Sequence, residues 1–454
     1  MQGSYATLSH CWGDVVLTKL LLSNFDDMMI SIDEGNLPLT FREAIATVRE
    51  LGIRYVWIDS LCIIQDSIAD WQRESASMTQ VYRNAICCLA ATGAQDSTQG
   101  LYLARDGPQA LPQITSSWTN RPNATYYAIG SSVSRLIGFE PQGPLNQRAW
   151  CYQELRLSHR IIHFTKEQII WECRQARAYE LMPFGTPKDD LDGNATGHKL
   201  RQIMFGQDDT TSSVDDVTSY EFWILMLEEY SDKRITRSSD RLIALSGLSR
   251  LLQKRMDSEY VAGMWMKQFE LYLLWQAILP SETRPDNRGP SWSWAPLDTR
   301  VWYGPFVVPQ NLPDYQSLVQ VLDVQVQHVT DDTYGQAHSG IATLHGRVCT
   351  FGRGIFSDEL QFLNSFAGIY WDTWSDEADS DAGVDMYWMP VYARRSVVCL
   401  DGLILRKVDG MKQDYRRAGK VLCVKSRDPS AGLEAYPDFW NAFFTFPEQV
   451  IRIH

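Results

Sequence analysis

Polar side chains follow directly on an apolar run near residue 55. Residues 55–58 are apolar, and Asp59, Ser60 and Cys62 come soon after them in the chain. A short apolar run of this kind is typical of a strand in a parallel sheet that helices cover on both faces. Such sheets carry their chemistry at the carboxyl ends of the strands. We therefore expect a strand over residues 55–62, with Asp59 and Ser60 in a functional site at its end.

A second group of polar side chains follows the first strand. Residues 5–13 predict a short strand that runs into a polar turn, and this turn carries Ser9 and His10. Histidine exchanges a proton near neutral pH, so His10 is a candidate acid or base. A core histidine with satisfied hydrogen bonds would give the same pattern. Asp59 likewise can act in chemistry or simply cap the next turn through its side chain.

Two predicted helices add further carboxylates. Residues 147–156 predict a helix in which Trp150 and Glu154, four positions apart, lie on one face. Glu154 is a candidate catalytic group, and the alternative is a carboxylate that accepts hydrogen bonds from neighbouring loops. A second helix is predicted over residues 68–84, where Glu74 shares a stripe with large apolar side chains. A buried ion pair with an arginine is the simpler interpretation of Glu74.

The alternation of strands and helices predicts the fold of the first 175 residues. Thr40 and Glu43 have the spacing of a capping box at the start of a helix that ends at Gly52. The expected class is α/β, with a doubly wound, mostly parallel sheet. Further strands are expected at residues 86–92, 161–164 and 168–173, and a long insertion at residues 93–145.

The remainder of the chain predicts a helical bridge followed by a β domain. Alternating apolar residues beyond Pro280 are typical of antiparallel strands. We expect an α/β domain at 1–175, a linker and helical bridge at 176–280, and a β-rich domain at 281–454. Helices are expected at residues 220–230, 240–255 and 264–279, and strands at 318–326, 341–350, 386–392, 397–406 and 420–425.

The composition of the chain argues against several classes of function. The chain has 454 residues and a formal charge of −13, which argues against a nucleic-acid partner because phosphate binding needs a basic surface. Its nine cysteines form no metal-ligand spacing, and Cys11, Cys62 and Cys151 are expected to be buried thiols rather than nucleophiles. The sequence has no secretory leader and no apolar segment of membrane-spanning length. We expect a soluble cytoplasmic protein without a membrane partner, and no oligomeric state is predicted.

Four segments together resemble the fungal HET (heterokaryon incompatibility) domain family. The resemblance implies a divergent TIR-type fold, and some TIR relatives cleave NAD with one essential glutamate in a W-C-x-x-E helix. Residues 150–154 match that pattern, so the resemblance implies a catalytic Glu154 with Ser9, His10 and Asp59 around it. The matching segments are Leu8-Ser9-His10-Cys11-Trp12-Gly13, residues 57–66 from Trp57 to Asp66, Ala149-Trp150-Cys151-Tyr152-Gln153-Glu154-Leu155, and Ser291-Trp292-Ser293-Trp294-Ala295.

Two features of the chain depart from an NAD-cleaving death effector. No glycine-rich phosphate fingerprint follows the first strand, and the chain is acidic. The first strand begins near Met1 without a nucleotide-binding or repeat module, so we expect a stand-alone protein. Some HET-like proteins are encoded beside enzymes of fungal secondary metabolism, and that resemblance implies a cofactor-free role on a small apolar molecule.

The preferred expectation is therefore a cofactor-independent cyclase of the [4+2] kind, acting on a terpenoid or polyketide intermediate. A cyclase needs an aromatic pocket and a hydrogen-bond donor that polarises one carbonyl. The alternative is an NAD glycohydrolase, for which NAD is a substrate, and a third class is a non-catalytic incompatibility protein that binds a partner. The expected catalytic residues are Glu154, His10, Asp59 and Ser9, and the expected substrate-binding residues are Trp12, Trp57, Ser60, Glu74, Trp150, Tyr152, Trp292 and Trp294.

Overall fold

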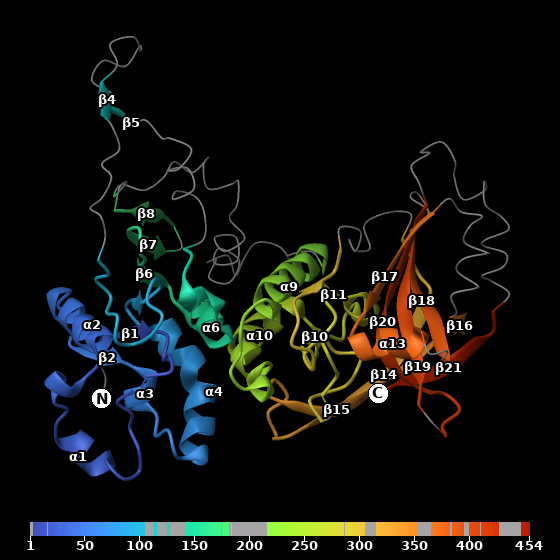
Figure 1. Cartoon of the computed structure of the whole chain (residues 1–454), viewed down its shortest axis with the longest axis horizontal. Helices are drawn as coiled ribbons and strands as arrows, with labels where there is room; N and C mark the ends of the chain where they lie inside the picture. The colour runs from blue at the N-terminus through green and yellow to red at the C-terminus, as the bar shows by residue number, and fades with distance from the viewer. Residues whose placement is uncertain are drawn as a thin grey trace. The chain divides into compact units, whose positions relative to one another are not determined.

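The chain folds into two compact units, Met1–Asp209 and Thr210–His454 (Figure 1). The predicted boundaries near residues 175 and 280 stay predictions, although the helices expected between them belong to the second unit. The structure is a computed structural model. It describes residues 3–15, 17–104, 113–115, 125–127, 141–173, 175–180, 183, 216–285, 287–304, 315–351, 365–381, 384–394, 399–408, 410–425 and 446–454.

The first unit is built on a six-stranded sheet with the strand order β2-β1-β3-β6-β7-β8. The first four strands are parallel, and β7 and β8 extend the sheet in antiparallel fashion. This confirms a mixed α/β unit with a mostly parallel sheet. The strands are β1 (Tyr5–Ser9), β2 (Tyr55–Trp57), β3 (Cys88–Ala90), β6 (Arg160–Phe164), β7 (Ile169–Cys173) and β8 (Arg177–Tyr179), and a separate hairpin joins β4 (Gln113–Thr115) to β5 (Thr125–Tyr127). Most of the expected insertion at 93–145 lies outside the described residues.

The strand predicted over residues 55–62 is shorter than expected. It ends at Trp57, and Asp59–Cys62 form a helical turn, α3. The reason is local, because the Cys62 amide bonds the Ile58 carbonyl and the Ser60 amide bonds the Asp59 side chain. The strand also lies at an edge of the sheet and pairs only with β1, so it is not buried on both faces.

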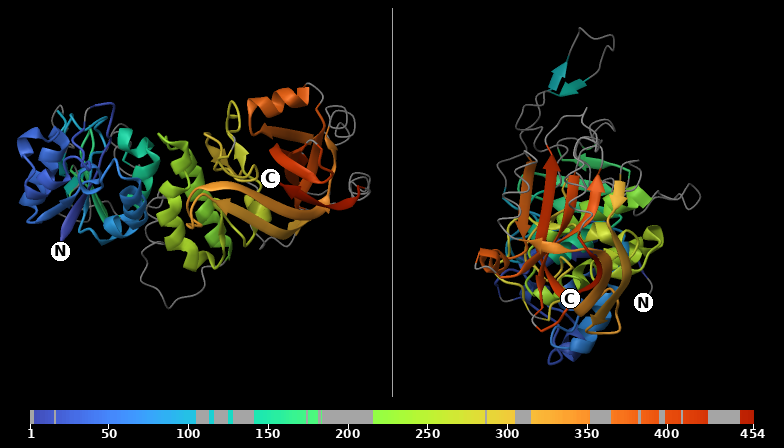
Figure 2. Two further views of the ribbon diagram at one scale, coloured as in Figure 1. Left: turned by 90° about the horizontal axis from the view of Figure 1, so that it is seen from below. Right: turned by 90° about the vertical axis from the view of Figure 1, so that its right-hand side faces the viewer.

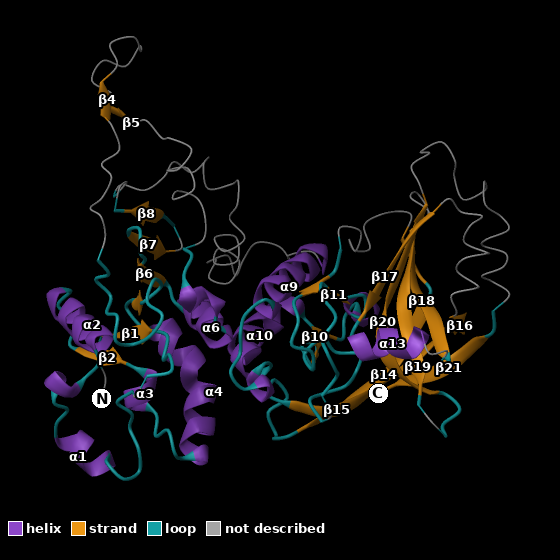
Figure 3. Ribbon diagram, viewed as in Figure 1, coloured by secondary structure: helices purple, strands orange, loops and turns teal. Residues whose placement is uncertain are grey.

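The helices of the first unit follow the predicted apolar periodicity (Figure 3). The helix predicted at 68–84 is present with those bounds, and the helix predicted at 147–156 is α6. Apolar side chains of α2 pack on β1 and β3 to form the core. The helices are α1 (Phe25–Ile30), η1 (Glu34–Asn36), α2 (Leu39–Glu50), α3 (Asp59–Cys62), α4 (Ile68–Asn84), η2 (Pro144–Gln147) and α6 (Ala149–Leu157).

The capping box predicted at Thr40 and Glu43 is wrong. Helix α2 already begins at Leu39, so Thr40 lies inside its first turn. The Thr40 hydroxyl instead accepts a hydrogen bond from the Gly100 amide at 3.1 Å, and the Glu43 carboxylate accepts from the Tyr102 amide at 3.0 Å. Both side chains therefore fasten the loop after β3 to α2.

The second unit combines a helical layer with a nine-stranded sheet (Figures 1 and 2). Neighbouring strands of the sheet are antiparallel, as predicted, except for the pair β20–β21. Its strands are β13 (Tyr315–Ser317), β14 (Val319–His328), β15 (Ala337–Arg347), β16 (Cys349–Phe351), β17 (Ser365–Trp371), β18 (Met386–Arg394), β19 (Cys399–Lys407), β20 (Asp414–Lys425) and β21 (Glu448–Ile453). The helices are α9 (Asp216–Ser231), η3 (Ser238–Asp240), α10 (Ile243–Met256), α11 (Phe269–Tyr272) and α13 (Trp374–Asp381).

The helix predicted at residues 264–279 is wrong. The segment holds a one-turn helix, α11, between two short strands, β10 (Met264–Trp265) and β11 (Gln276–Ala277). Long-range contacts replace the helical hydrogen bonds, because the carbonyls of Leu273 and Leu274 accept from Arg417 and Lys420 of the large sheet. Strand β10 forms a hairpin with β9 (Tyr260–Val261), and β11 pairs antiparallel with β12 (Val301–Trp302), which comes later in the chain. Across the described residues, no helix is long and apolar enough to cross a membrane.

The backbone at Gly143, before α6, lies very close to the backbone that follows β3. A larger residue at this position should therefore destabilise the protein. A Cβ atom on Gly143 would lie 2.0 Å from the carbonyl oxygen of Thr92, which follows β3. Because backbone must move to relieve this overlap, we expect Gly143→Ala to lower the free energy of unfolding by about 2 kcal/mol or more. Urea denaturation followed by circular dichroism measures this loss.

Gly52 is the matched control for this substitution. It has a φ of +69°, and a Cβ atom there would meet no atom within 4 Å. Gly52→Ala should therefore cost only about 1 kcal/mol, the cost of a left-handed backbone. Equal losses in the two variants would contradict the close approach at Gly143.

Candidate active site

The candidate site lies at the carboxyl ends of the parallel strands, where the strand order changes direction. After β1 the chain places β2 on one side of that strand and β3 on the other. In open α/β sheets, ligands bind outside the carboxyl ends of the strands at such a switch point. Ser9 is the last residue of β1, and its hydroxyl donates a hydrogen bond of 2.5 Å to the carboxyl of Glu154 on α6. The predicted meeting of Ser9 and Glu154 is thus present.

Glu154 is a buried carboxyl with an altered affinity for protons. Only 5% of its surface is exposed. Burial and, to a smaller extent, the negative charge of Asp59 raise the pKa of Glu154 from 4.5 to about 7. The Ser9 hydroxyl, the positive charge of Arg148 and the Tyr82 hydroxyl oppose this rise without cancelling it. A carboxyl with these properties can change protonation state near neutral pH, which suits a general acid, a general base or an electrostatic catalyst.

Asp59 is the second carboxylate of the site, and it is held in one orientation. Its Oδ2 accepts a hydrogen bond of 2.8 Å from the Trp12 indole, and its Oδ1 accepts one of 2.7 Å from the Ser60 amide. The Nδ1 atom of His10 lies 3.9 Å from Oδ1. The side chain of Asp59 remains 23% exposed, so it can meet a ligand. The structure therefore brings Ser9, His10, Trp12, Asp59, Ser60 and Glu154 together, as the sequence predicted.

His10 is buried beside Asp59 and against the core. Its ring meets that of Phe41 edge to face, with the centroids 4.9 Å apart. Burial lowers the pKa of His10, although the charge of Asp59 acts in the opposite direction. Within the part of the chain that the structure describes, the Nε2 atom of His10 and the hydroxyl of Ser60 have no hydrogen-bond partner. A neutral imidazole follows from this burial, and it can act as a donor or an acceptor.

Two polar groups of the site were missed at the level of sequence. Tyr82 comes from α4, and its hydroxyl donates to the Leu8 carbonyl over 3.4 Å in addition to its effect on Glu154. Arg148 precedes α6 and is half-buried. Tyr82 lies on the apolar stripe of the predicted helix at 68–84, and Arg148 lies two residues before the W-C-x-x-E motif. Both positions are equally typical of structural residues, so neither one indicated a site residue.

Two of the three cysteines considered for the site, Cys11 and Cys151, are shielded from solvent. Cys11 and Cys151 are buried, as predicted, whereas Cys62 is exposed. Burial raises the pKa of the Cys11 thiol and, more strongly, that of Cys151. Both thiols therefore stay protonated near neutral pH, where they are poor nucleophiles.

Three elements of the first unit, β2, α4 and α6, carry aromatic side chains that pack on one another. Trp57 of β2 packs edge to face on Tyr82 at 5.6 Å, and Trp150 of α6 packs in the same way on Trp71 of α4 at 6.3 Å. These three tryptophans are half-buried, so part of each ring reaches solvent. Tyr152 is buried beneath the guanidinium of Arg156.

Glu74 pairs with an arginine, as its structural interpretation expects, but the predicted burial of the pair is wrong. Its Oε1 accepts a hydrogen bond of 3.2 Å from the adjacent Arg73. The pair is partly exposed rather than buried, because the Glu74 side chain is 25% exposed and that of Arg73 is 67% exposed. A role for Glu74 in substrate binding stays a prediction.

Trp292 and Trp294, the remaining predicted site residues, belong to the core of the second unit. Both are fully buried. The Trp294 indole donates to the Gly263 carbonyl at 3.1 Å, and Trp292 packs on Phe269 with the ring centroids 5.3 Å apart. Their predicted place among the substrate-binding residues stays a prediction, and the contacts they make are those of packing residues.

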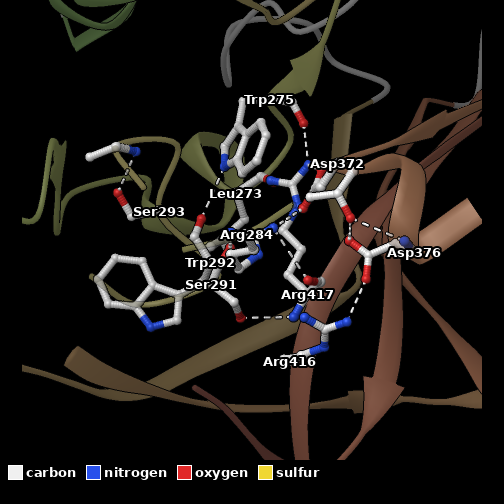
Figure 4. Close-up of polar contacts among 12 residues, drawn as sticks. Leu273, Trp275, Arg284, Ser291, Trp292, Ser293, Asp372, Asp376, Arg416 and Arg417 are labelled. Atoms are coloured by element: carbon white, nitrogen blue, oxygen red, sulfur yellow. Dashed lines mark hydrogen bonds and ion pairs between the residues drawn. The ribbon is translucent and has the colours of Figure 1, made fainter. Parts of the chain in front are cut away.

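The motif that contains these tryptophans supports a buried charge network (Figure 4). Arg417 of β20 donates to Asp372 at 3.1 Å and stacks on the Trp275 ring, while its amide bonds the Ser291 hydroxyl at 2.8 Å. Arg284 pairs with the other oxygen of Asp372 at 2.7 Å. Because both Arg417 and Asp372 are fully buried, removal of either partner would leave an uncompensated charge. Residues 291–295 are thus explained by the stability of this unit.

One comparison with known proteins found a family model that matches most of the described part of the first unit. Residues 5–154 match the family model described as heterokaryon incompatibility protein (HET). The match runs from the first residue of β1 to Glu154, so it includes Ser9, Asp59 and Glu154. No curated protein and no solved structure matches the chain. In the described part of the chain, no group of three or more His, Cys, Asp and Glu side chains is arranged to hold a metal ion.

The buried carboxyl predicts a dependence of stability on pH. A carboxyl whose pKa rises from 4.5 to about 7 on folding binds its proton more tightly in the folded state, so folding becomes less favourable as pH rises through that interval. Glu154→Gln removes this ionisation. Relative to the variant, the natural protein should lose up to about 3 kcal/mol of unfolding free energy between about pH 5 and about pH 8.

Denaturation curves of both proteins at several pH values test this expectation. Glu167 is an exposed glutamate near the end of β6, and Glu167→Gln is the matched control. The control should follow the natural protein at every pH. A Glu154→Gln variant that also follows it would show that the carboxyl is not buried as described.

Proposed function

The chain carries a HET domain over residues 5–154, and from this premise we propose that the domain hydrolyses the bond between nicotinamide and ribose in NAD. The observation that carries the proposal is the environment of Glu154, a single buried carboxyl bonded to Ser9 at the switch point of a parallel sheet. The position agrees with what the resemblance to NAD-cleaving TIR relatives implies. In this reaction NAD is a substrate and no further cofactor takes part.

The topology of the first unit supports a divergent TIR-type fold. The parallel strands follow the order β2-β1-β3-β6, which is the order of doubly wound sheets that bind nucleotides at the switch point. The antiparallel strands β7 and β8 are an addition to that pattern. We propose that they are an extension of the fold, since they lie at the edge furthest from β2.

The proposed reaction breaks the bond between ribose C1′ and the pyridinium nitrogen. The bonding electron pair leaves with the nitrogen, so nicotinamide departs as a neutral molecule and positive charge develops on the ribose. The ionised Glu154 carboxylate stabilises that charge. A water molecule then bonds C1′ and releases a proton to the carboxylate or to solvent. The products are nicotinamide, ADP-ribose and one proton.

The neighbours of Glu154 have supporting roles in this proposal. Asp59 is oriented by Trp12 and Ser60 and can accept hydrogen bonds from ribose hydroxyls. The half-exposed rings of Trp57 and Trp150 offer stacking surfaces for an aromatic base. Arg148 supplies positive charge in an acidic protein that has no glycine-rich phosphate loop.

The cyclase and the partner-binding interpretations stay predictions. A cyclase depends on apolar walls, and two of the five tryptophans expected to form them are packed in the core of the second unit. The polar surroundings of Glu154 instead favour a reaction that develops charge. A folded protein that releases no nicotinamide would return the choice to these alternatives.

The first test is nicotinamide release from NAD by the purified chain. Glu154→Gln keeps the size of the side chain but loses its negative charge, so we expect the release rate to fall by about a thousandfold. Glu167→Gln, which alters an exposed glutamate, should retain the natural rate. Equal rates for the two variants, with both shown to be folded by circular dichroism, would contradict the assigned role of Glu154.

The second test uses pH. The carboxylate form of Glu154 is needed, so kcat/KM should rise with pH through a midpoint near 7. Since the negative charge of Asp59 raises the pKa of Glu154, Asp59→Asn should move this midpoint to lower pH. The exposed Asp14 provides the control, and Asp14→Asn should leave the midpoint in place. A midpoint that Asp59→Asn does not move would separate Asp59 from the ionisation of Glu154.

A further inference from the structure

Helix α1 of the first unit carries an uncovered apolar surface. None of its six residues is buried. Met29 is 69% exposed and Ile30 is 85% exposed, and Leu22 just before the helix is 63% exposed. Figures 1 and 3 show α1 as a separate short helix at the margin of the first unit, joined to its neighbours by loops. Exposed apolar side chains that cluster in this way mark sites of interaction rather than packing.

The apolar side chains lie within one short stretch of the chain. Phe25 and Met29 are four residues apart within α1 and so lie on one face of the helix, and the exposed Leu22 and Ile32 flank the helix at its two ends. Ile68 at the start of α4 joins them, since the Leu22 amide bonds the side chain of Asp66, two residues before it. The α1 surface therefore comprises the six exposed side chains Leu22, Phe25, Met29, Ile30, Ile32 and Ile68.

The segment is held firmly at its base although its apolar side chains lack cover. The Leu20 amide donates to the Ser60 carbonyl at 2.8 Å, and the Gln65 amide donates to the Leu20 carbonyl at 2.9 Å. The Asn24 side chain accepts from the Leu21 amide and donates to the Lys19 carbonyl. The α1 surface is thus presented by an ordered loop, and a partner would pay little ordering entropy to bind it.

The rim of the α1 surface is acidic. Asp26, Asp27, Asp33 and Asp66 surround the apolar side chains, and none of them enters an ion pair among the described residues. The basic side chains nearby already have partners. Lys19 lies over the Trp12 ring, Arg49 pairs with Glu34, and Arg73 pairs with Asp70.

We propose that the α1 surface docks a protein segment whose apolar side chains are flanked by lysine and arginine. Charge complementarity selects this partner, because basic flanks would meet four aspartates that have no ion-pair partner among the described residues. A second copy of this chain is disfavoured, since it has a net charge of −13 and would bring like charges together. An anionic membrane is disfavoured for the same reason. The proposal is independent of the reaction assigned to Glu154.

A labelled helical peptide of leucine and lysine, about 14 residues or four turns long, is the probe. We expect the full-length protein to bind it, and the affinity to fall as salt rises because charge contributes. The double substitution of Met29→Asp and Ile30→Asp should weaken binding at least about tenfold. Asp26→Lys with Asp27→Lys should also weaken it, and a peptide with glutamate in place of lysine should bind poorly to the natural protein.

Ile86 provides the control, because it is exposed at the start of β3 and lies outside the α1 surface. Ile86→Asp should bind the leucine–lysine peptide with natural affinity. Loss of affinity in Ile86→Asp equal to that in the α1 variants would overturn the proposal. Tighter binding to anionic lipid vesicles than to the peptide, or a dimer that the Met29 and Ile30 substitutions abolish, would overturn it in favour of a membrane or a second copy.

Discussion

The removal of Glu154 from water is the interaction on which the first unit's chemistry depends. A buried carboxyl costs free energy when it ionises, and this cost moves its pKa into the neutral range. The Ser9 hydroxyl at the end of β1 and the Tyr82 hydroxyl from α4 lower the cost without abolishing it. Strand β1, helix α4 and helix α6 must therefore keep their mutual positions for the site to exist. The close approach of Gly143 to Thr92 fixes the entry into α6 and serves that end.

The negative charge of Asp59, at the start of α3, acts on the carboxyl of Glu154 on α6. Asp59 stands at the start of α3, where Trp12 and the Ser60 amide hold both of its oxygens. It raises the pKa of Glu154 from a position that remains partly exposed.

Local patterns in the sequence predicted the elements that depend on local interactions. Helix α4 has the predicted bounds because its apolar residues recur at helical spacing, and the spacing of Trp150 and Glu154 correctly placed them on one helix. Elements that depend on distant partners were not predicted. The segment at 264–279 is rich in apolar residues, yet its carbonyls bond Arg417 and Lys420, more than 140 residues away in the chain. Sequence spacing carries no record of such contacts.

In the candidate site and in the second unit, too, local patterns were predicted and contacts between distant residues were not. Ser9, His10 and Asp59 were predicted because carboxyl ends of parallel strands share one edge, and Glu154 was predicted from the W-C-x-x-E motif on its helix. The structure brings these four residues together. Tyr82 and Arg148 were missed because their roles come from the packing of α4 and α6 around Glu154. Trp292 and Trp294 were chosen for their motif, whereas their observed contacts stabilise a core beside the Arg417–Asp372 pair.

The central claim is that Glu154 is a desolvated carboxyl that titrates near neutral pH. Carbon-13 NMR of protein labelled at the glutamate carboxyls measures this directly, with Glu154→Gln used to assign the resonance. We predict a titration midpoint near pH 7. A midpoint near the ordinary value of 4.5 would contradict the account, because it would mean that Glu154 is solvated or neutralised by a cation.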